Sequence, residues 1–330
     1  MSGDTLPMHL AQDGPSESYE DLLSQWSDLE SGLGMLLAVP DNVEGFHQKL
    51  RQHDRWMQEL LEQDADTALY LLFQMAGTSI AGYSTTHSLV CAALCHIIAL
   101  ELHLPTGQRD SLVAAALTMN ISMTALQDEL AEQTTRPSVE QQTNIDAHSV
   151  KSCLLLARVG IKDELWLAIV ASHHENLPLT LPGSMPDPVL RLTHILQVTD
   201  RYAAMISPRR SRPGRSVTDS LRAVISASQG RHDDVAQALV RHVGLCPPGT
   251  YVRLENQDLA VVLRRTERLN QPLVASLIDP RGEPYPHPRL RNIALGEQRI
   301  QAAVPSDAVK LMINHAVMIS VARSQLPRSG

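Results

Sequence analysis

The chain has 330 residues, of which 43% are hydrophobic and 19% charged. This composition excludes a disordered protein and a coiled rod, and the length suits one large domain or two modest ones. Lys and Arg number 28 against 36 Asp and Glu, a formal net charge of −8 that excludes a protein binding nucleic acid over its whole surface. Aromatic residues make up only 3%, which favours helices over sheets. The 14 histidines against 4 cysteines direct attention to a hydrolytic metal site.

The start of the chain predicts a tail followed by helices. Residues 1–16 are rich in Pro, Gly, Ser and Asp and contain no Lys or Arg, which predicts a flexible tail without a secretory signal. Residues 17–76 are expected to form an N-terminal helical segment. Its apolar side chains recur every three or four residues and so share one helix face: Leu22, Trp26, Leu29, Leu33 and Leu36. This stripe packs either on the protein's own core, which we favour, or on a partner or second copy.

The rest of the chain is predicted to be helical except for one stretch. Residues 77–245 are expected to form successive helices, residues 246–305 a small β-rich subdomain, and residues 306–330 a C-terminal helix capped by Ser306 or Asp307. Three short apolar runs predict three strands in the subdomain: 251–254, 259–263 and 273–278. The expected fold class is therefore mainly α, a multi-helix domain with a small β-rich appendage near the C-terminus.

Apolar and cysteine patterns bear on the compartment. The most apolar stretch, residues 89–100, is shorter than the roughly 18 residues that a membrane-spanning helix needs. The four cysteines include no CxxC pair and predict no disulfide framework. We therefore expect a cytoplasmic protein with no membrane contact. Cys91 and Cys95 share a helix face with His87; this spacing leaves a metal trio open, but small apolar packing residues are favoured.

The main signal is a set of His and Asp residues in apolar helical surroundings. No GxxxxGK[ST], GxSxG or HExxH motif is present, which argues against P-loop, serine-hydrolase and zincin chemistry. Instead, His87 ends a Tyr-Ser-Thr-Thr-His run, His148 and Asp200 lie within helical stretches, and His173 and His174 are adjacent. Neighbouring helical residues point about 100° apart, so the adjacent pair can reach one site only where a helix ends. A Leu-Pro pair shortly afterwards predicts that end.

The order of these motifs resembles the HD-GYP family, whose active members hydrolyse cyclic di-GMP at a metal centre. The family opens with Tyr-Ser, two variable residues and His, as at Tyr83 to His87. It continues with a His at a helix start, a His-His-Glu, an Asp in a Val-x-Asp-x-Tyr context and a Pro-Pro-Gly before short strands. All occur here in that order within about residues 77–280. The resemblance implies an HD-type helical domain with five metal-ligand positions: His87, His148, His173, His174 and Asp200.

The chain departs from the family at the motif that names it. Met119 and Asn120 stand where the family has His-Asp, and Met123 stands where it has the lysine of a Gly-Lys pair. The segment 176–183 keeps only Pro and Gly of the family's glycine-rich motif. In the family the Asp bridges two metals, whereas Asn120 offers one neutral carbonyl oxygen and Met119 a soft thioether. In-line hydrolysis that needs two metals is therefore expected to be broken.

The remaining donors predict a reduced metal site. We expect either no metal or one divalent metal, Fe, Mn or Zn, on His148, His173 and His174. Three histidines with one open position form a chemically competent site, so weak single-metal hydrolysis stays open.

An arginine-rich loop follows the last of these motifs. The run from Pro208 to Arg215 contains four arginines between prolines and a glycine. Arginine side chains bind phosphate oxygens through paired N–H groups. Arg209, Arg210 and Arg212 are therefore candidate ligands for a cyclic dinucleotide. A solvated surface loop is the competing interpretation.

Three functions fit these patterns. The favoured one is a degenerate HD-GYP-like domain in bacterial cyclic-dinucleotide signalling, which binds cyclic di-GMP or a signalling protein and has lost or weakened phosphodiesterase activity. The second is an active metal-dependent cyclic di-GMP phosphodiesterase. The third is a helical protein-interaction module without a nucleotide ligand, which the N-terminal stripe would permit. None of the three involves nucleic acid.

Overall fold

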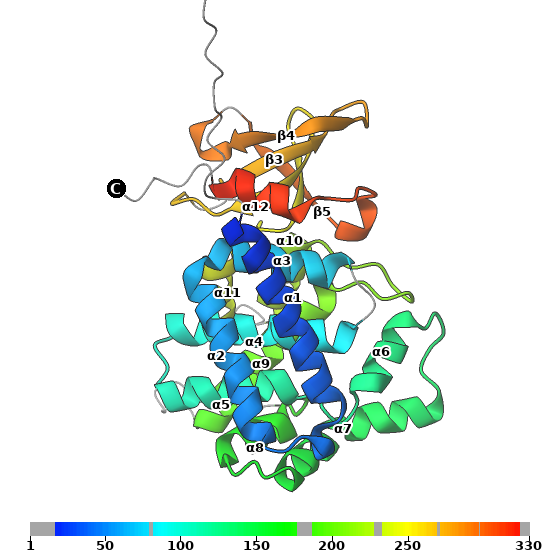
Figure 1. Ribbon diagram of the computed structural model, residues 1–330. Helices are drawn as coiled ribbons and strands as arrows, with labels where there is room; N and C mark the ends of the chain where they lie inside the picture. The colour runs from blue at the N-terminus through cyan, green and yellow to red at the C-terminus, as the bar shows by residue number, and fades with distance from the viewer. Residues whose placement is uncertain are drawn as a thin grey trace, which may run out of the picture.

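The computed structural model describes residues 17–78, 82–176, 187–227, 233–268, 271–296 and 298–323. The predicted tail at 1–16 lies outside these residues, as does the Leu-Pro pair at 177–178. Figure 1 shows a body of helices with a small sheet at one end. The predicted fold class, mainly α with a β-rich appendage, is confirmed.

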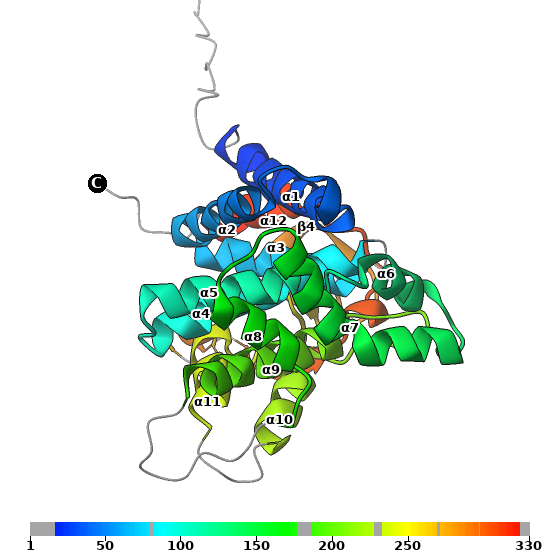
Figure 2. The same ribbon diagram turned by 90° about the horizontal axis from the view of Figure 1, so that it is seen from below.

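The helices of the described residues occur in this order: α1 (Glu17–Ala38), α2 (Phe46–Gln63), α3 (Ala65–Thr78), α4 (Tyr83–Glu101), α5 (Thr106–Thr118), α6 (Thr124–Glu132), α7 (Val139–Arg158), α8 (Glu164–Ser172), α9 (Pro188–Ile206), α10 (Val217–Ala227), α11 (Asp234–Val243) and α12 (His315–Arg323). Short 3₁₀ turns lie at Pro40–Asn42, Ile293–Leu295 and Ser306–Ala308. Figure 2 shows α4 and α5 in the middle, with α1 to α3 on one side and α8 and α9 on the other.

Helix α4 is apolar on nearly every face, and such a helix is stable only when it is surrounded. It incorporates the apolar stretch 89–100 into a longer helix. In the described part of the chain it is the one helix long and apolar enough to cross a membrane by length and composition. However, 83% of its most apolar window is buried inside the protein, as in a core helix.

The N-terminal stripe packs inward. All five of its predicted apolar residues are buried and belong to the main core cluster, together with residues of α4 and α9. Helix α1 also reaches the first motif directly, because Glu30 accepts a hydrogen bond from the Thr86 hydroxyl. The interpretation of the stripe as a core-packing face is therefore confirmed.

The appendage is a five-stranded antiparallel sheet rather than the predicted three strands. Its order is β4-β3-β2-β1-β5, and the strands are β1 (Tyr251–Leu254), β2 (Leu259–Arg264), β3 (Leu273–Ile278), β4 (Pro284–Asn292) and β5 (Ile300–Val304). The two missed strands are the edges. Strand β4 contains three prolines, which are tolerated at a sheet edge because one side of the strand needs no partner. Such a strand shows no apolar run.

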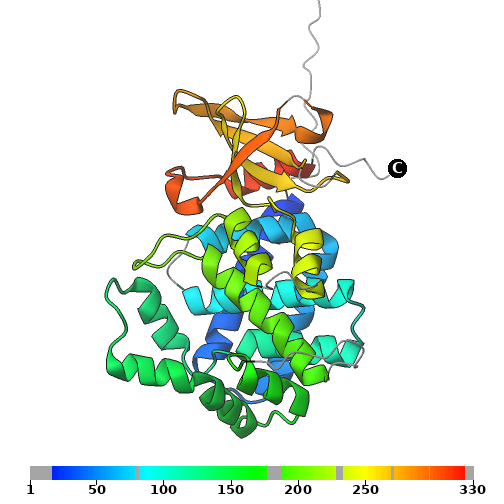
Figure 3. The same ribbon diagram turned by 180° about the vertical axis from the view of Figure 1, so that it is seen from behind.

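The predicted C-terminal helix begins later than expected. Ser306 and Asp307 belong to a 3₁₀ turn, and α12 starts at His315. The Ser306 hydroxyl donates to the Gly77 carbonyl at 2.8 Å, so it joins the end of α3 instead of capping a helix. Figure 3 shows from behind how the sheet covers the end of the helical body.

Candidate metal centre

His87 is positioned by the start of α4. Gly82 precedes the helix with φ of 69°, and the first turn is capped from another helix. Asp128 of α6 accepts hydrogen bonds from the Ser84 backbone N–H at 2.7 Å and from the Ser84 hydroxyl at 3.0 Å. A carboxylate at this end also opposes the positive end of the helix dipole. His87 lies one turn further on and is only 2% exposed.

His87 pairs with Asp200 of α9 across the packed helices. Its Nε2 lies 2.8 Å from Asp200 Oδ1. The Sγ of Cys91, one turn along α4, lies 3.7 Å from the same Nε2. The donor atoms of His87, Cys91 and Asp200 all lie within 4.8 Å of one another. From the sequence, Cys91 was favoured as a packing residue. Its position four residues after His87, one helical turn, was the signal that predicted this contact.

Asp200 is ionised in this setting. Burial acts to raise the pKa of its carboxyl, but the hydrogen bond and charge of His87, with the nearby His173 and His174, lower it to about 2. The charges of His173 and His174 contribute to this lowering of the pKa, so the second histidine group acts electrostatically on Asp200.

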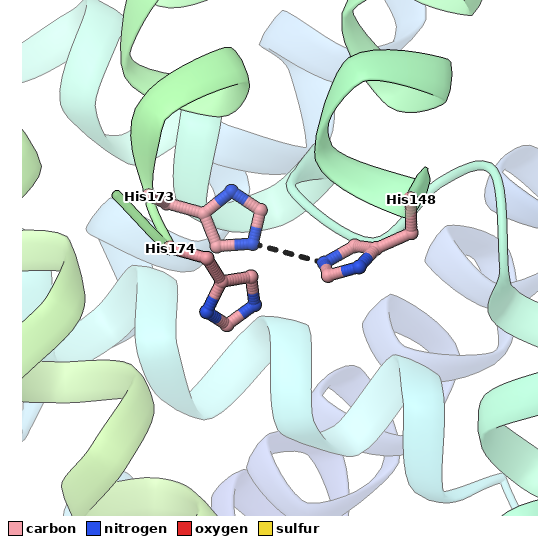
Figure 4. A group of neighbouring side chains, drawn as sticks. All are labelled: His148, His173 and His174. Carbon is pink, nitrogen blue, oxygen red and sulfur yellow. Dashed lines mark hydrogen bonds between the residues drawn. The ribbon is translucent and has the colours of Figure 1, made fainter. Parts of the chain in front are cut away.

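The second group unites His148, His173 and His174. Their ligand atoms lie within 4.8 Å of one another, and Figure 4 shows the three rings converging from α7 and from the end of α8. His173 is the C-cap of α8, and His174 follows in the turn. The prediction that the adjacent pair lies at a helix end is therefore confirmed. The ring centroids of His173 and His174 are 4.2 Å apart.

Two rings of this group have their tautomers fixed by the backbone. The Nδ1 of His148 bonds the Ile145 carbonyl, and the Nδ1 of His173 bonds the Val170 carbonyl at 2.7 Å. A carbonyl only accepts, so each Nδ1 carries the proton and each neutral ring leaves a lone pair on Nε2. These Nε2 atoms face each other at 3.1 Å. Two lone pairs at this distance repel unless a proton or a metal ion lies between them.

A proton between the two Nε2 atoms is the less favourable way to remove this repulsion. Burial lowers the pKa of His148, and burial followed by the charge of His174 lowers the pKa of His173 to about 4. Two imidazole nitrogens on one tetrahedral zinc, each at 2.0–2.1 Å, would lie about 3.3 Å apart. Metal-ligating histidines also commonly donate the other ring N–H to a carbonyl. The residues present therefore fit one divalent metal on His148, His173 and His174.

The residues that replace the family's name-giving pair lie at the end of α5 and in the turn that follows it, and this turn contacts the backbone of His148. Met119 is fully buried and belongs to the main core cluster. Asn120 is buried in the turn after α5, and Met123 directly precedes α6. In the same turn the Ser122 hydroxyl donates to the His148 carbonyl at 2.9 Å. The turn thus contacts α7 at His148 and carries a neutral amide instead of a carboxylate.

The three predicted arginines differ in their surroundings. Arg209 donates to the Tyr83 hydroxyl at 2.9 Å, and its guanidinium lies 5.0 Å from the centre of that ring. Arg212 is half-buried and donates to the Ala204 carbonyl. Arg210 is exposed, and its backbone N–H bonds the Ala131 carbonyl at 2.8 Å. Of the three, Arg209 is the one that hydrogen-bonds to the first motif.

Tyr83 connects the arginine loop to the His87 pair. Its ring stacks on the His87 ring with an interplanar angle of 9° and centroids 5.6 Å apart. Burial raises the pKa of its hydroxyl, although the nearby Arg209 opposes this. Sequence reasoning used Tyr83 as a motif marker and missed this contact, because the loop arrives from more than a hundred residues away.

Known proteins resemble the chain in part. No family model matches it. The chain is 26% identical over 201 residues to cyclic di-GMP phosphodiesterase PA4108 of Pseudomonas aeruginosa. The matched region covers 60% of this chain and 47% of that relative. The predicted resemblance to the HD-GYP family is confirmed. This HD-GYP-like chain spans about half the length of that relative.

A solved structure is also similar. It is Bd1817, a HDG"Y"P protein from Bdellovibrio bacteriovorus, with 13% identity and a TM-score of 0.48 over 71% of this chain and 74% of that one. A likeness at this level carries no conclusion about chemistry.

Proposed function

We propose that the chain is a degenerate HD-GYP-like domain that binds cyclic di-GMP and has lost or weakened phosphodiesterase activity. The ligand is suggested by the relative, which is named a cyclic di-GMP phosphodiesterase. The observation that carries the loss of activity is the turn after α5. It carries the neutral Asn120, buries Met119 in the core, and contacts the His148 carbonyl through Ser122.

The chemistry of that turn explains why hydrolysis would suffer. Displacement at a phosphate with two metals needs an anionic group that neutralises both ions and fixes their spacing. The amide of Asn120 has one neutral acceptor oxygen for this purpose. Met119 has no exposed surface, so its thioether would have to leave the core to reach a metal. Neither side chain replaces the ligands that the family uses.

The three histidines can still hold one divalent metal, Fe, Mn or Zn. A metal on such a site supplies Lewis-acid polarisation and a bound water of lowered pKa. The protein's own part is orientation. The Ile145 and Val170 carbonyls hold the His148 and His173 rings with Nε2 inward, and the exposed His174 closes the group from the solvent side. This arrangement suits a site that retains a phosphate oxygen.

The arginine loop supports the ligand assignment. Cyclic di-GMP carries two phosphate anions, which arginine binds through charge-assisted hydrogen bonds. Arg209 is half-buried and lies over Tyr83, next to the His87 pair. We infer that Arg209 contacts a phosphate, with Arg210 and Arg212 in supporting positions. Regulation through a signalling protein partner is the remaining part of the proposal.

An active phosphodiesterase is the second candidate. The observation in its favour is that all five predicted ligand residues fall into two groups, each with its ligand atoms within 4.8 Å of one another, and that His173 and His174 act electrostatically on Asp200. A single-metal enzyme would need these ligand residues and one open coordination position on the metal.

Hydrolysis and binding assays separate these functions. With added manganese or iron, we expect cyclic di-GMP to bind without turnover above background. Turnover by the wild-type chain that His173→Ala abolishes would establish the phosphodiesterase instead. Absence of binding with and without metal would leave the protein-interaction function. The double variant Met119→His with Asn120→Asp, checked for folding, is expected to gain metal and turnover if degeneracy is the cause.

A further inference from the structure

The His87 pair includes a third donor that the family resemblance does not supply. Cys91 lies on α4 four residues after His87, so both side chains leave the same helix face. Asp200 approaches from α9. The group therefore offers one imidazole nitrogen, one sulfur and one carboxylate, all within 4.8 Å of one another.

We propose that His87, Cys91 and Asp200 form a separate site for one thiophilic divalent cation such as zinc. The proposal goes beyond the three-histidine site and does not depend on whether the chain binds a nucleotide. It assigns Cys91 a role as a ligand.

The separations fit a small four-coordinate ion. Zinc takes nitrogen and oxygen at 2.0–2.2 Å and sulfur at 2.3 Å, so its ligand atoms lie about 3.3–3.6 Å apart. In the protein, His87 Nε2 lies 2.8 Å from Asp200 Oδ1 and 3.7 Å from Cys91 Sγ. The third separation, between the Cys91 sulfur and an Asp200 carboxylate oxygen, is within 4.8 Å, and the donors close on an ion by moving toward it.

Burial and charge favour the same assignment. Cys91 has no exposed surface, whereas the Asp200 side chain is 23% exposed and provides the side from which an ion and a fourth ligand enter. When the metal–sulfur bond forms, the thiol proton leaves to solvent, as it does for other thiolate ligands. The thiolate and the Asp200 carboxylate then balance the two positive charges of the ion. A buried dication needs such compensation.

The His87 ring is free to act as a neutral ligand. Within the described residues, its Nδ1 is buried and has no hydrogen-bond partner. Without an ion, the ionised Asp200 carboxylate accepts a hydrogen bond from Nε2, so that nitrogen carries the ring proton. An ion that binds at Nε2 displaces this proton, and the unpartnered Nδ1 can take it up. With the proton on Nδ1, Nε2 presents a lone pair to the ion.

A sulfur ligand also makes the site selective. Soft thiolate favours zinc or cobalt over the harder magnesium and manganese. Three imidazole nitrogens follow the same order of metals more weakly, because they include no soft sulfur. The two groups should therefore respond differently to the same set of metals.

Cys95 supplies a matched control on the same helix. It is also fully buried, one turn beyond Cys91, but its sulfur lies 3.2 Å from the Thr199 hydroxyl and outside the cluster. Replacement of either cysteine by serine removes one thiol from the same core. Only Cys91→Ser removes a sulfur from the proposed site.

Cobalt(II) absorption tests the proposal on the purified full-length chain. After metal removal and titration with cobalt, we expect a thiolate-to-cobalt charge-transfer band in the near ultraviolet, which zinc then abolishes. The band should disappear in Cys91→Ser and weaken in Asp200→Asn at equal cobalt. It should persist in Cys95→Ser and in His173→Ala.

Two results would overturn the proposal: no charge-transfer band in the wild-type chain, or a band that Cys91→Ser leaves unchanged. The first result uses only the wild-type protein, so the proposal can be overturned even if Cys91→Ser does not fold. Asp200→Asn keeps every thiol, and a band that it leaves unchanged would remove Asp200 from the site. Failure of the three-histidine site gives a different pattern. In that case cobalt bound by the wild type and by His173→Ala would be equal, whatever the near-ultraviolet band shows.

Discussion

The Nε2 atoms of His148 and His173 face each other at 3.1 Å while both Nδ1 atoms are engaged by backbone carbonyls. The pair therefore has no way to hydrogen-bond when both rings are neutral. Since burial lowers the pKa of both rings, a shared proton is disfavoured at neutral pH. A bound metal ion removes the repulsion and uses both lone pairs.

Loss of one ring should therefore remove the metal and its stabilising effect. In His173→Ala we expect the metal of the three-histidine site to be lost, so that elemental analysis after purification gives less metal per chain than in the wild type. We also expect no rise in melting temperature on addition of manganese, which the sulfur-containing site does not favour. A metal held at 100 times its Kd would stabilise the wild type by about 2.7 kcal/mol.

The matched control is His194→Ala. His194 lies on α9 and contacts Asp233 at 3.2 Å, outside the three-histidine group. This variant should keep both the metal and the thermal shift. Equal metal in His173→Ala and the wild type would exclude the three-histidine site.

The sequence predicted local features that depend on neighbours along the chain. The Leu22 to Leu36 stripe and the helix end before His173 follow from helical spacing and were found as expected. The order of the motifs was sufficient to indicate the family. Each of these features depends on a short stretch of residues and on the physics of a single helix.

Features that depend on distant packing were missed. Strand β4 pairs with the edge that β3 offers. Its prolines interrupt the apolar pattern by which a strand is predicted from sequence. The approach of Cys91 to Asp200 requires one particular position of α4 along the axis of α9. The Arg209 contact with Tyr83 joins segments that are 126 residues apart. No local pattern contains such distances.

Arg209 should matter more than its neighbour for cyclic di-GMP binding. Its guanidinium lies over Tyr83 beside the metal-ligand residues, whereas Arg210 is exposed. A hydrogen bond to a charged group contributes about 1.5–3 kcal/mol, so Arg209→Gln should weaken binding roughly tenfold or more. Isothermal titration calorimetry measures this directly.

Arg210→Gln removes the same charge from the same loop and is the control. We expect less than a threefold change in its Kd, as for a screened surface charge. Equal losses in the two variants would show that the loop acts only through net charge. Unchanged binding in both would exclude these two residues from the ligand site.

The joint between the helical body and the sheet should be sensitive to pH. Asp64 and Arg264 form a 2.9 Å ion pair, with side chains 3% and 15% exposed. Burial acts to raise the pKa of Asp64, but hydrogen bonding and the charge of Arg264 outweigh it and lower the pKa. A lowered folded-state pKa contributes stability above the unfolded value of about 3.9, and that stability is lost as pH falls through the folded value.

Asp64→Asn should therefore destabilise the fold by about 2 kcal/mol at pH 7, because it removes the closest buried partner of Arg264. The difference from the wild type should shrink below about pH 4. Urea unfolding at several pH values measures both effects.

For comparison, Asp41→Asn breaks an ion pair with Arg158 whose side chains are 51% and 66% exposed. It should cost less than about 1 kcal/mol, and an equal cost would contradict the proposed role of burial.

Gly249, two residues before β1, packs closely against α3. Its φ is +86°, and a Cβ there would lie 2.4 Å from the Tyr70 carbonyl oxygen of α3. Gly249→Ala should therefore lower the free energy of unfolding by about 3 kcal/mol or more, from backbone strain and from forced separation of β1 and α3. Gly282 has a similar φ of +88°, but no atom lies within 4 Å of the point that a Cβ would occupy there. Gly282→Ala should lose only about 1–2 kcal/mol from the left-handed conformation. If chemical denaturation gave the same loss for both variants, strain alone would account for Gly249 and the sheet would not be tightly seated on α3.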